Sequence, residues 1–297
     1  MENTSNILVI GGTGKTGRKV ASKLTKAGHN VRIGSRSATP SFEWDNPETW
    51  EESMQGMDKV YITFQPDLAV PGALEAIEEL TKKAKKCNVQ KLVLLSGKGE
   101  REAELCEQVI IHSGLDYTIV RASWFNQNFS ESFFLEPILE GFVALPQAEA
   151  KVPYVDTDDI ADVAVEALLH DKHNGEIYQL TGPRLLTFKE VIQEISEATR
   201  REIAFTPIAL PAYTQVMKQQ GVPADFVWLI EYLFSEVLGN PDNSEITNDI
   251  EKVLGRKPID FSQYDQETLV TGIWNPVKPN SIQYKTIEKW KNGKNNN

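Results

Sequence analysis

The stretch Ile7-Leu8-Val9-Ile10-Gly11-Gly12-Thr13-Gly14-Lys15-Thr16-Gly17 decides the predicted fold of this 297-residue chain. Residues 7–10 form a short apolar run rich in β-branched side chains, which is typical of a strand buried on both faces. Glycines then stand at the first, fourth and seventh positions of a turn. Glycine leaves room for a tight reversal, for backbone N–H groups beside a phosphate, and for close packing of the next helix on the strand.

The residues after this turn complete a βαβ unit. Residues 15–27 carry Val20, Ala21 and Leu24 at helical spacing, and Gly28 ends that predicted helix. Residues 30–34 are predicted to form a second strand. A strand, a glycine turn, a helix and a second strand within about 30 residues together predict a bound dinucleotide.

A triphosphate-binding loop is the rival interpretation of the same turn. Gly14-Lys15-Thr16 matches the end of the pattern Gly-x-x-x-x-Gly-Lys-Thr. That pattern requires glycine at position 9, but Val9 stands there, inside the predicted strand. We therefore predict that the residues of this turn contact a dinucleotide, namely Gly11, Thr13, Gly14, Lys15, Thr16 and Gly17.

The end of the second predicted strand indicates which dinucleotide binds. NAD sites usually carry an acidic residue there, which binds the ribose hydroxyls. This chain instead has Gly34-Ser35-Arg36-Ser37. Arg36 can pair with a 2′-phosphate and the two serines can donate to it, so we predict NADP(H) in preference to NAD(H). The alternative is that Arg36 is a solvated side chain at the end of a strand.

The alternation of strands and helices continues through the first half of the chain. Apolar runs predict further strands at residues 60–64, 91–96 and 117–121, separated by helices at 72–87 and 100–112. Strands joined by helices of this length predict the α/β class, with a doubly wound parallel sheet of the Rossmann type. Residues 177–180 can return to that sheet as a further strand.

The second half is predicted to be mainly helical and to lie over the carboxyl ends of the strands, where open α/β sheets bind ligands. Its predicted helices span residues 158–170, 188–200 and 211–236. We divide the chain into a dinucleotide-binding domain over residues 1–182, a smaller substrate-binding region over 183–290 with a contribution from 124–150, and a disordered tail over 291–297.

Composition excludes several other classes of protein. The net charge of -11 disfavours nucleic acid as a partner. No run approaches the ~20 apolar residues that cross a bilayer, and residues 1–6 do not resemble a signal peptide, so we expect a cytoplasmic protein without membrane contact. Cys87 and Cys106 are predicted to be structural thiols, and no metal site is expected. The predicted partner is a small-molecule substrate; a protein partner is left open, and the chain is expected to be a monomer or a homodimer.

The usual catalytic pair of short-chain dehydrogenases is missing. In those enzymes a Tyr-x-x-x-Lys pair on a helix supplies a proton to the carbonyl that is reduced. The corresponding residues 100–109 contain neither residue type. Ser96 stands where such enzymes carry a serine, and it is the one candidate catalytic residue here.

Four motifs in the expected order make this chain resemble the NmrA-like family of atypical short-chain dehydrogenases. The first is the glycine turn with its preceding strand. The others are residues 113–121 followed by Trp124-Phe125-x-x-Asn128-Phe129, residues 152–156 with Asp159-Ile160-Ala161, and residues 180–183 followed by Thr187-Phe188. Within that family, residues 35–37 and 124–130 are most similar to ergot-alkaloid reductases and to NAD(P)H-dependent quinone or azo reductases.

The resemblance implies further contacts. Trp44 and Asp45 would lie near the adenine, Thr63, Phe64 and Gln65 would contact the cofactor, and the nicotinamide wall would comprise Ser96, Gly97, Ala122, Trp124 and Phe125. The residues expected to contact the substrate are Trp124, Phe125, Asn128, Phe129, Phe133 and Tyr154. For Phe129 and Phe133, packing between the two parts of the chain is the alternative.

The absence of the Tyr-x-x-x-Lys pair limits the kinds of acceptor that the protein is predicted to reduce. An iminium needs only hydride, and a quinone can take its proton from water. We therefore predict an NADP(H)-dependent oxidoreductase that delivers hydride to an electron-poor iminium, quinone or enone held between aromatic walls, without an acid–base residue. The alternative is a redox sensor that binds NADP(H) without turnover and acts through protein partners.

Overall fold

A six-stranded parallel sheet forms the centre of the first half of the molecule. The computed structural model describes residues 4–276, so the tail predicted over 291–297 lies outside the described residues. The strands run in the order β2-β1-β3-β4-β5-β7, and each neighbouring pair is parallel. Their bounds are β1 (Asn6–Ile10), β2 (Asn30–Gly34), β3 (Lys59–Ile62), β4 (Lys91–Gly97), β5 (Asp116–Ala122) and β7 (Glu176–Leu180). The predicted doubly wound α/β fold is confirmed, and residues 177–180 do return to the sheet.

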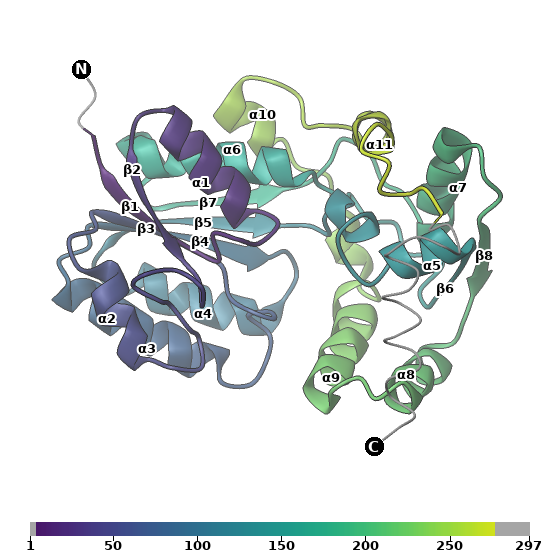
Figure 1. Cartoon of the computed structure of the whole chain (residues 1–297), viewed down its shortest axis with the longest axis horizontal. Coiled ribbons are helices and arrows are strands. Elements are labelled where there is room, and N and C mark those ends of the chain that lie inside the picture. The colour runs from purple at the N-terminus through teal and green to yellow at the C-terminus, as the bar shows by residue number, and fades with distance from the viewer. Residues whose placement is uncertain (1–3, 277–297) are drawn as a thin grey trace.

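Helices cover both faces of this sheet (Figure 1). One face carries α1 (Gly17–Lys26), α6 (Thr157–Leu169) and α10 (Asp249–Leu254), and the other carries α2 (Glu48–Met54), α3 (Ala73–Lys86) and α4 (Arg101–Ile111). Apolar side chains of the strands alternate between the two layers: Leu8 and Ile10 pack under α2–α4, and Ile7 and Val9 pack under α1 and α6. This alternation is the period-2 pattern of a strand that is buried on both faces.

A second lobe lies beside the sheet (Figure 1). Its helices and strands are α5 (Leu135–Glu140), β6 (Phe142–Leu145), α7 (Phe188–Thr199), β8 (Ala204–Pro207), α8 (Leu210–Gln219), α9 (Ala224–Tyr232) and α11 (Phe261–Leu269). Short 3-10 or π turns occupy Asn126–Phe129, Asp171–His173, Leu233–Val237 and Pro241–Ser244. The pair β6–β8 is a small parallel sheet that the sequence analysis missed.

The single helix predicted over residues 211–236 is wrong. The structure ends α8 at Gln219 and starts α9 at Ala224. Gly221 between them has φ +73°, a left-handed conformation that ends a helix. Pro223 then stands as the residue before α9. After the break, α9 lies between α8 and the first lobe (Figure 1).

The core of the second lobe is aromatic. Phe129, Phe134, Phe188 and Phe234 are each at most 1 % exposed, and Phe129 stacks on Phe134 with a ring-centre distance of 5.2 Å. This core joins residues 129–154 to residues 186–274. We keep the division near residue 182 as a proposal, with the addition that α10 crosses back to pack against α6 and β7.

Three further features bear on the class of the protein. Within residues 4–276 no helix has the length and apolarity that crossing a bilayer requires. The same residues hold no cluster of three or more metal-ligating side chains. Cys87 and Cys106 are free and buried.

Candidate active site

The glycine turn follows β1, which pairs with β2 on one side and with β3 on the other. The strand order therefore changes direction between β1 and β3. Ligands of open α/β sheets bind at such a point, beside the carboxyl ends of the strands. Gly11 follows β1 and Thr63 follows β3, and the Thr63 hydroxyl donates to the carbonyl oxygen of Ile10 at 3.1 Å.

The turn is too tight for side chains at its glycines. Gly11 has φ +72°, and a β-carbon there would lie 1.9 Å from Oγ1 of Thr63. A β-carbon on Gly17 would lie 2.2 Å from the carbonyl oxygen of Gly11. That oxygen accepts the Gly14 N–H at 2.8 Å, which closes the turn. The bare backbone at the start of α1 fits a pyrophosphate group, which binds to N–H groups at a helix N-terminus.

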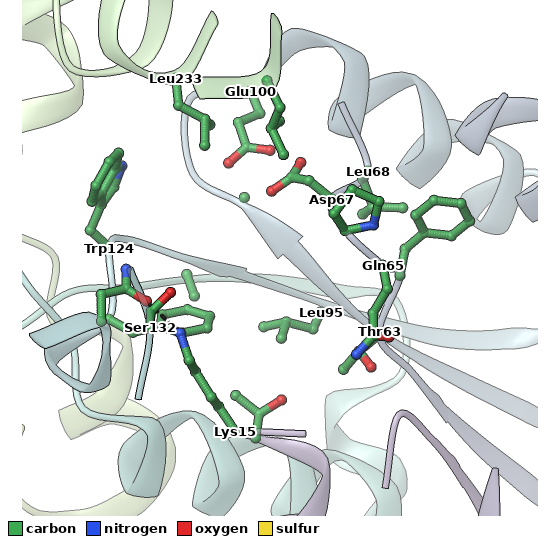
Figure 2. Close-up of a pocket in the computed structure, with 18 of the residues that line it drawn as sticks. Lys15, Thr63, Gln65, Asp67, Leu68, Leu95, Glu100, Trp124, Ser132 and Leu233 are labelled. Atoms are coloured by element: carbon green, nitrogen blue, oxygen red, sulfur yellow. Dashed lines mark hydrogen bonds between the residues drawn. The ribbon is translucent and has the colours of Figure 1, made fainter. Parts of the chain in front are cut away.

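A cavity of about 420 Å³ opens from this turn toward α9. Figure 2 shows Lys15 on one side, Thr63 and Gln65 on another, and Leu233 and Trp124 at the far end. The structure brings fourteen of the predicted residues to its wall: Gly11, Gly14, Lys15, Thr16, Thr63, Phe64, Gln65, Ser96, Gly97, Ala122, Trp124, Phe125, Asn128 and Phe133.

Five other predicted cofactor residues do not line the cavity. Thr13 is exposed at the tip of the turn, and Gly17 is buried at the start of α1. Ser35 and Arg36 follow β2, where Arg36 is exposed, and Asp45 is exposed in the loop before α2. Their roles remain predictions.

Phe129 and Tyr154 do not fit the predicted substrate contacts. Phe129 is fully buried in the aromatic core of the second lobe, and Tyr154 packs edge-on against it at 5.4 Å. The Tyr154 hydroxyl is buried and has no hydrogen-bond partner among the described residues. Both rings pack in the core of the second lobe, and neither lines the cavity.

Lys15 is the basic side chain of the glycine turn. Its Nζ donates to Oδ1 of Asn128 at 2.8 Å, so it is held inside the cavity. Burial lowers the pKa of Lys15 to about 8, although Glu131 opposes this shift. A partly buried ammonium at this place suits an anionic ligand, whose charge would restore the ordinary pKa.

Ser96 is oriented by a buried ion pair. Its hydroxyl donates to Oε1 of Glu107 at 2.6 Å. Arg121 donates to both oxygens of the same carboxylate through Nε at 2.9 Å, and Glu107 is fully buried. Since the Ser96 hydrogen is engaged with Glu107, only lone pairs of Ser96 face the cavity. Ser96 can accept a hydrogen bond from a ligand amide, but it does not supply a proton in this arrangement.

Two carboxyl groups and one apolar wall of the cavity were not predicted from the sequence. Asp67 and Glu100 follow the ends of β3 and β4, at the edge of the sheet where ligands of such folds bind. The apolar wall comes from α9 and the turn after it, and its side chains recur at helical spacing: Phe226, Leu229, Ile230 and Leu233.

The sequence of this chain is similar to those of known proteins along most of its length. The sequence model of the NAD(P)H-binding protein family matches residues 11–171. Prestalk A differentiation protein A of Dictyostelium discoideum is 29 % identical over 89 % of this chain and 92 % of its own length. Festuclavine synthase II of Penicillium roqueforti is 29 % identical over 86 % and 95 %. The NAD(P)H azoreductase of Xenophilus azovorans is 28 % identical over 87 % and 96 %. The resemblance to ergot-alkaloid and azo reductases is therefore confirmed.

Solved structures support the fold. The NADPH complex of an NADPH-dependent quinone oxidoreductase from Escherichia coli superimposes with a TM-score of 0.70. It is 17 % identical in sequence, and the match covers 89 % of this chain and 99 % of that one.

Proposed function

The chain belongs to the NAD(P)H-binding family and is an NAD(P)H-dependent oxidoreductase, and we propose that it transfers hydride from NADP(H) to an electron-poor small molecule. The observation that carries this proposal is one continuous cavity that runs from Lys15 of the glycine turn to the apolar side chains of α9. It offers the glycine turn and Lys15 for the cofactor and, away from that turn, an apolar wall for an acceptor. Among the described residues that line it there is no tyrosine.

Each end of the cavity has a distinct task. Bound dihydronicotinamide supplies two electrons and a proton as hydride. The glycine turn and Lys15 bind and neutralise phosphate, and Ser96 offers lone pairs to an amide. Trp124, Phe125 and Phe133 provide flat apolar walls for a conjugated acceptor, and the α9 side chains exclude water from it.

The direct test is NADPH consumption against a panel of quinones, enones and iminium compounds. Turnover with at least one class is expected, with a lower rate when NADH replaces NADPH. Tight NADPH binding without turnover of any acceptor would contradict the proposal and favour a redox sensor.

Arg36 is proposed to select NADP(H). The Arg36→Ala variant is expected to lose about 10- to 100-fold in affinity for NADPH while its affinity for NADH stays nearly constant, because a charged hydrogen bond of about 1.5–3 kcal/mol is removed. The measurement is the ratio of the two dissociation constants. A variant that still strongly prefers NADPH would show that another group binds the 2′-phosphate.

Lys15 predicts how cofactor binding depends on pH. Below pH 8 its ammonium is charged and assists phosphate binding; above its pKa of about 8 the free protein loses that charge. We expect the dissociation constant of NADPH to be flat below this pH and to rise above it, by about 10-fold or more. Lys15→Arg keeps its charge, so its dissociation constant should stay flat over the same range. A similar rise in both proteins would assign the effect to another group.

A further inference from the structure

Two carboxyl groups lie at the far end of the cavity from the glycine turn. Asp67 comes from the loop after β3, and Glu100 directly precedes α4. Figure 2 shows the two side chains pointing toward one another, across the cavity from Lys15. Neither carboxyl group is needed for the transfer of hydride from the cofactor to the acceptor.

The two carboxyl groups face one another at a place where little water reaches Glu100. Glu100 is only 8 % exposed, and no donor among the described residues reaches its buried Oε2. The side chains of Asp67 and Glu100 hydrogen-bond one another. Two carboxyl groups can do so only when one of them carries a proton. Oδ1 of Asp67 also accepts the Ala69 N–H at 2.8 Å, which favours the charge on Asp67 and the proton on Glu100.

The surrounding charges favour the same assignment. Burial raises the pKa of Glu100 well above its usual range, and the charge of Asp67 raises it further, as do Glu102 and Glu107 of α4. Burial also raises the pKa of Asp67, while its bonds to Glu100 and Ala69 oppose that rise. Lys98 lines the same cavity, but its Nζ donates to the carbonyl oxygen of Asn243 at 3.2 Å. The wall contributed by α9 is apolar.

The Glu100 carboxyl lies beside the proposed nicotinamide wall. A β-carbon on Gly97 would lie 2.0 Å from Oε1 of Glu100, so the carboxyl packs directly on the end of β4. Gly97 and its neighbour Ser96 line the cavity at the proposed nicotinamide wall. A molecule that stacks there has the Glu100 carboxyl within the same enclosure.

We propose that Glu100 is the proton donor for the reduced acceptor and that Asp67 holds this proton and relays its replacement from solvent. This proposal rests on the proposed function and narrows it to acceptors whose reduction leaves charge on oxygen, such as quinones and enones. The acceptor gains hydride from NADPH and a proton from Glu100; NADP⁺ and the Glu100 carboxylate remain, and the carboxylate regains a proton from water. The expectation that no acid–base residue takes part is thereby revised.

Glu100→Gln tests the donor directly, because glutamine keeps the shape and a hydrogen bond to Asp67 but supplies no acid. We expect kcat with a quinone or enone to fall about 10²- to 10⁴-fold, with the NADPH dissociation constant unchanged. A cationic iminium acceptor, whose reduced product is neutral, should keep its rate. Glu104→Gln, a charge removal on a more exposed side chain of α4, is the matched control and should behave as wild type. Loss of the cationic acceptor instead, through a raised KM, would show that the pair binds cations and would overturn the proposal.

Asp67→Asn supplies a second variant. The wild-type kcat for a quinone is expected to fall as pH rises through the pKa of Glu100. Removal of the Asp67 charge lowers that pKa, so the fall should begin at a lower pH. An unshifted profile would overturn the role of Asp67.

Infrared spectroscopy of the protein without substrate tests the proton independently of turnover. At neutral pH the difference spectrum of wild type minus Glu100→Gln is expected to show a protonated-carboxyl C=O band. The buried Asp265 carboxyl, whose pKa is raised to about 8, is protonated in both proteins and cancels in the difference. A difference spectrum without this band would overturn the proposal. Wild-type protein that reduces no acceptor would overturn the proposed function, and this donor role with it. Normal wild-type turnover that is insensitive to Glu100→Gln would overturn the donor role alone.

Discussion

Replacing Gly17 by alanine is expected to weaken NADPH binding about 10- to 100-fold and to lower the free energy of unfolding by about 1–3 kcal/mol. An alanine within a helix is ordinarily more stable than a glycine, by about 1 kcal/mol. Here the new β-carbon would lie 2.2 Å from the carbonyl oxygen of Gly11. That oxygen cannot move without loosening its bond from the Gly14 N–H, so the turn must open and its phosphate-binding N–H groups must move.

Gly28→Ala is the matched control for this prediction. Gly28 ends α1 with φ +89°, and no atom lies within 4 Å of the position of its missing β-carbon. Its replacement should cost about 1–2 kcal/mol through the left-handed backbone alone and should leave NADPH binding unchanged. Denaturant unfolding and fluorescence titration with NADPH measure the two effects. A Gly17→Ala protein that binds NADPH as tightly as wild type would show that this turn does not hold the cofactor.

The first lobe could be predicted from sequence because its signals are local. The run of residues 7–10 is apolar on both faces, and the glycines that follow it permit the tight turn that a phosphate group requires. Each later strand of the sheet repeats the same short apolar pattern, and right-handed crossovers then fix the topology. The second lobe lacks such signals. The strands Phe142–Leu145 and Ala204–Pro207 pair across a long sequence separation, and one of them ends in proline.

Several residues that were predicted to form the site, and that line the cavity in the structure, directly follow a strand. Gly11, Thr63 and Gly97 all lie at or just beyond the carboxyl ends of parallel strands, which meet at one edge of the sheet. Phe129 and Tyr154 were predicted as substrate contacts but lie in the core, and for Phe129 packing was the stated alternative. A cluster of aromatic residues indicates an apolar environment without showing whether it is a cavity wall or a core.

Asp67 and Glu100 line the cavity but were not predicted as site residues. An acidic residue before a helix is usually explained by its favourable interaction with the helix dipole, so Glu100 looks like a solvated helix start. Only the three-dimensional structure shows that the loop after β3 covers it and removes it from water. The burial that changes the chemistry of this carboxyl arises from a contact between segments that are distant in sequence.

The ion pair under Ser96 gives the other large expected effect. Arg121→Met is expected to lower the free energy of unfolding by about 3–5 kcal/mol, because it leaves the fully buried Glu107 carboxylate without its countercharge. Arg121 binds that carboxylate through Nε at 2.9 Å and through a second nitrogen at 2.5 Å, and Ser96 alone cannot replace both bonds. Denaturant unfolding measures the loss.

Two further variants show whether the loss of stability comes from the unpaired buried charge or from the lost side-chain volume. The double variant Glu107→Met with Arg121→Met removes both charges and should recover most of the stability, because apolar groups can replace a buried pair. Lys252→Met removes an exposed partner of Asp249 and should cost less than about 1 kcal/mol. If the double variant were as unstable as Arg121→Met, the loss would come from packing. A stable double variant would also free the Ser96 hydroxyl, so a change in its NADPH affinity would show that Glu107 orients Ser96 toward the cavity.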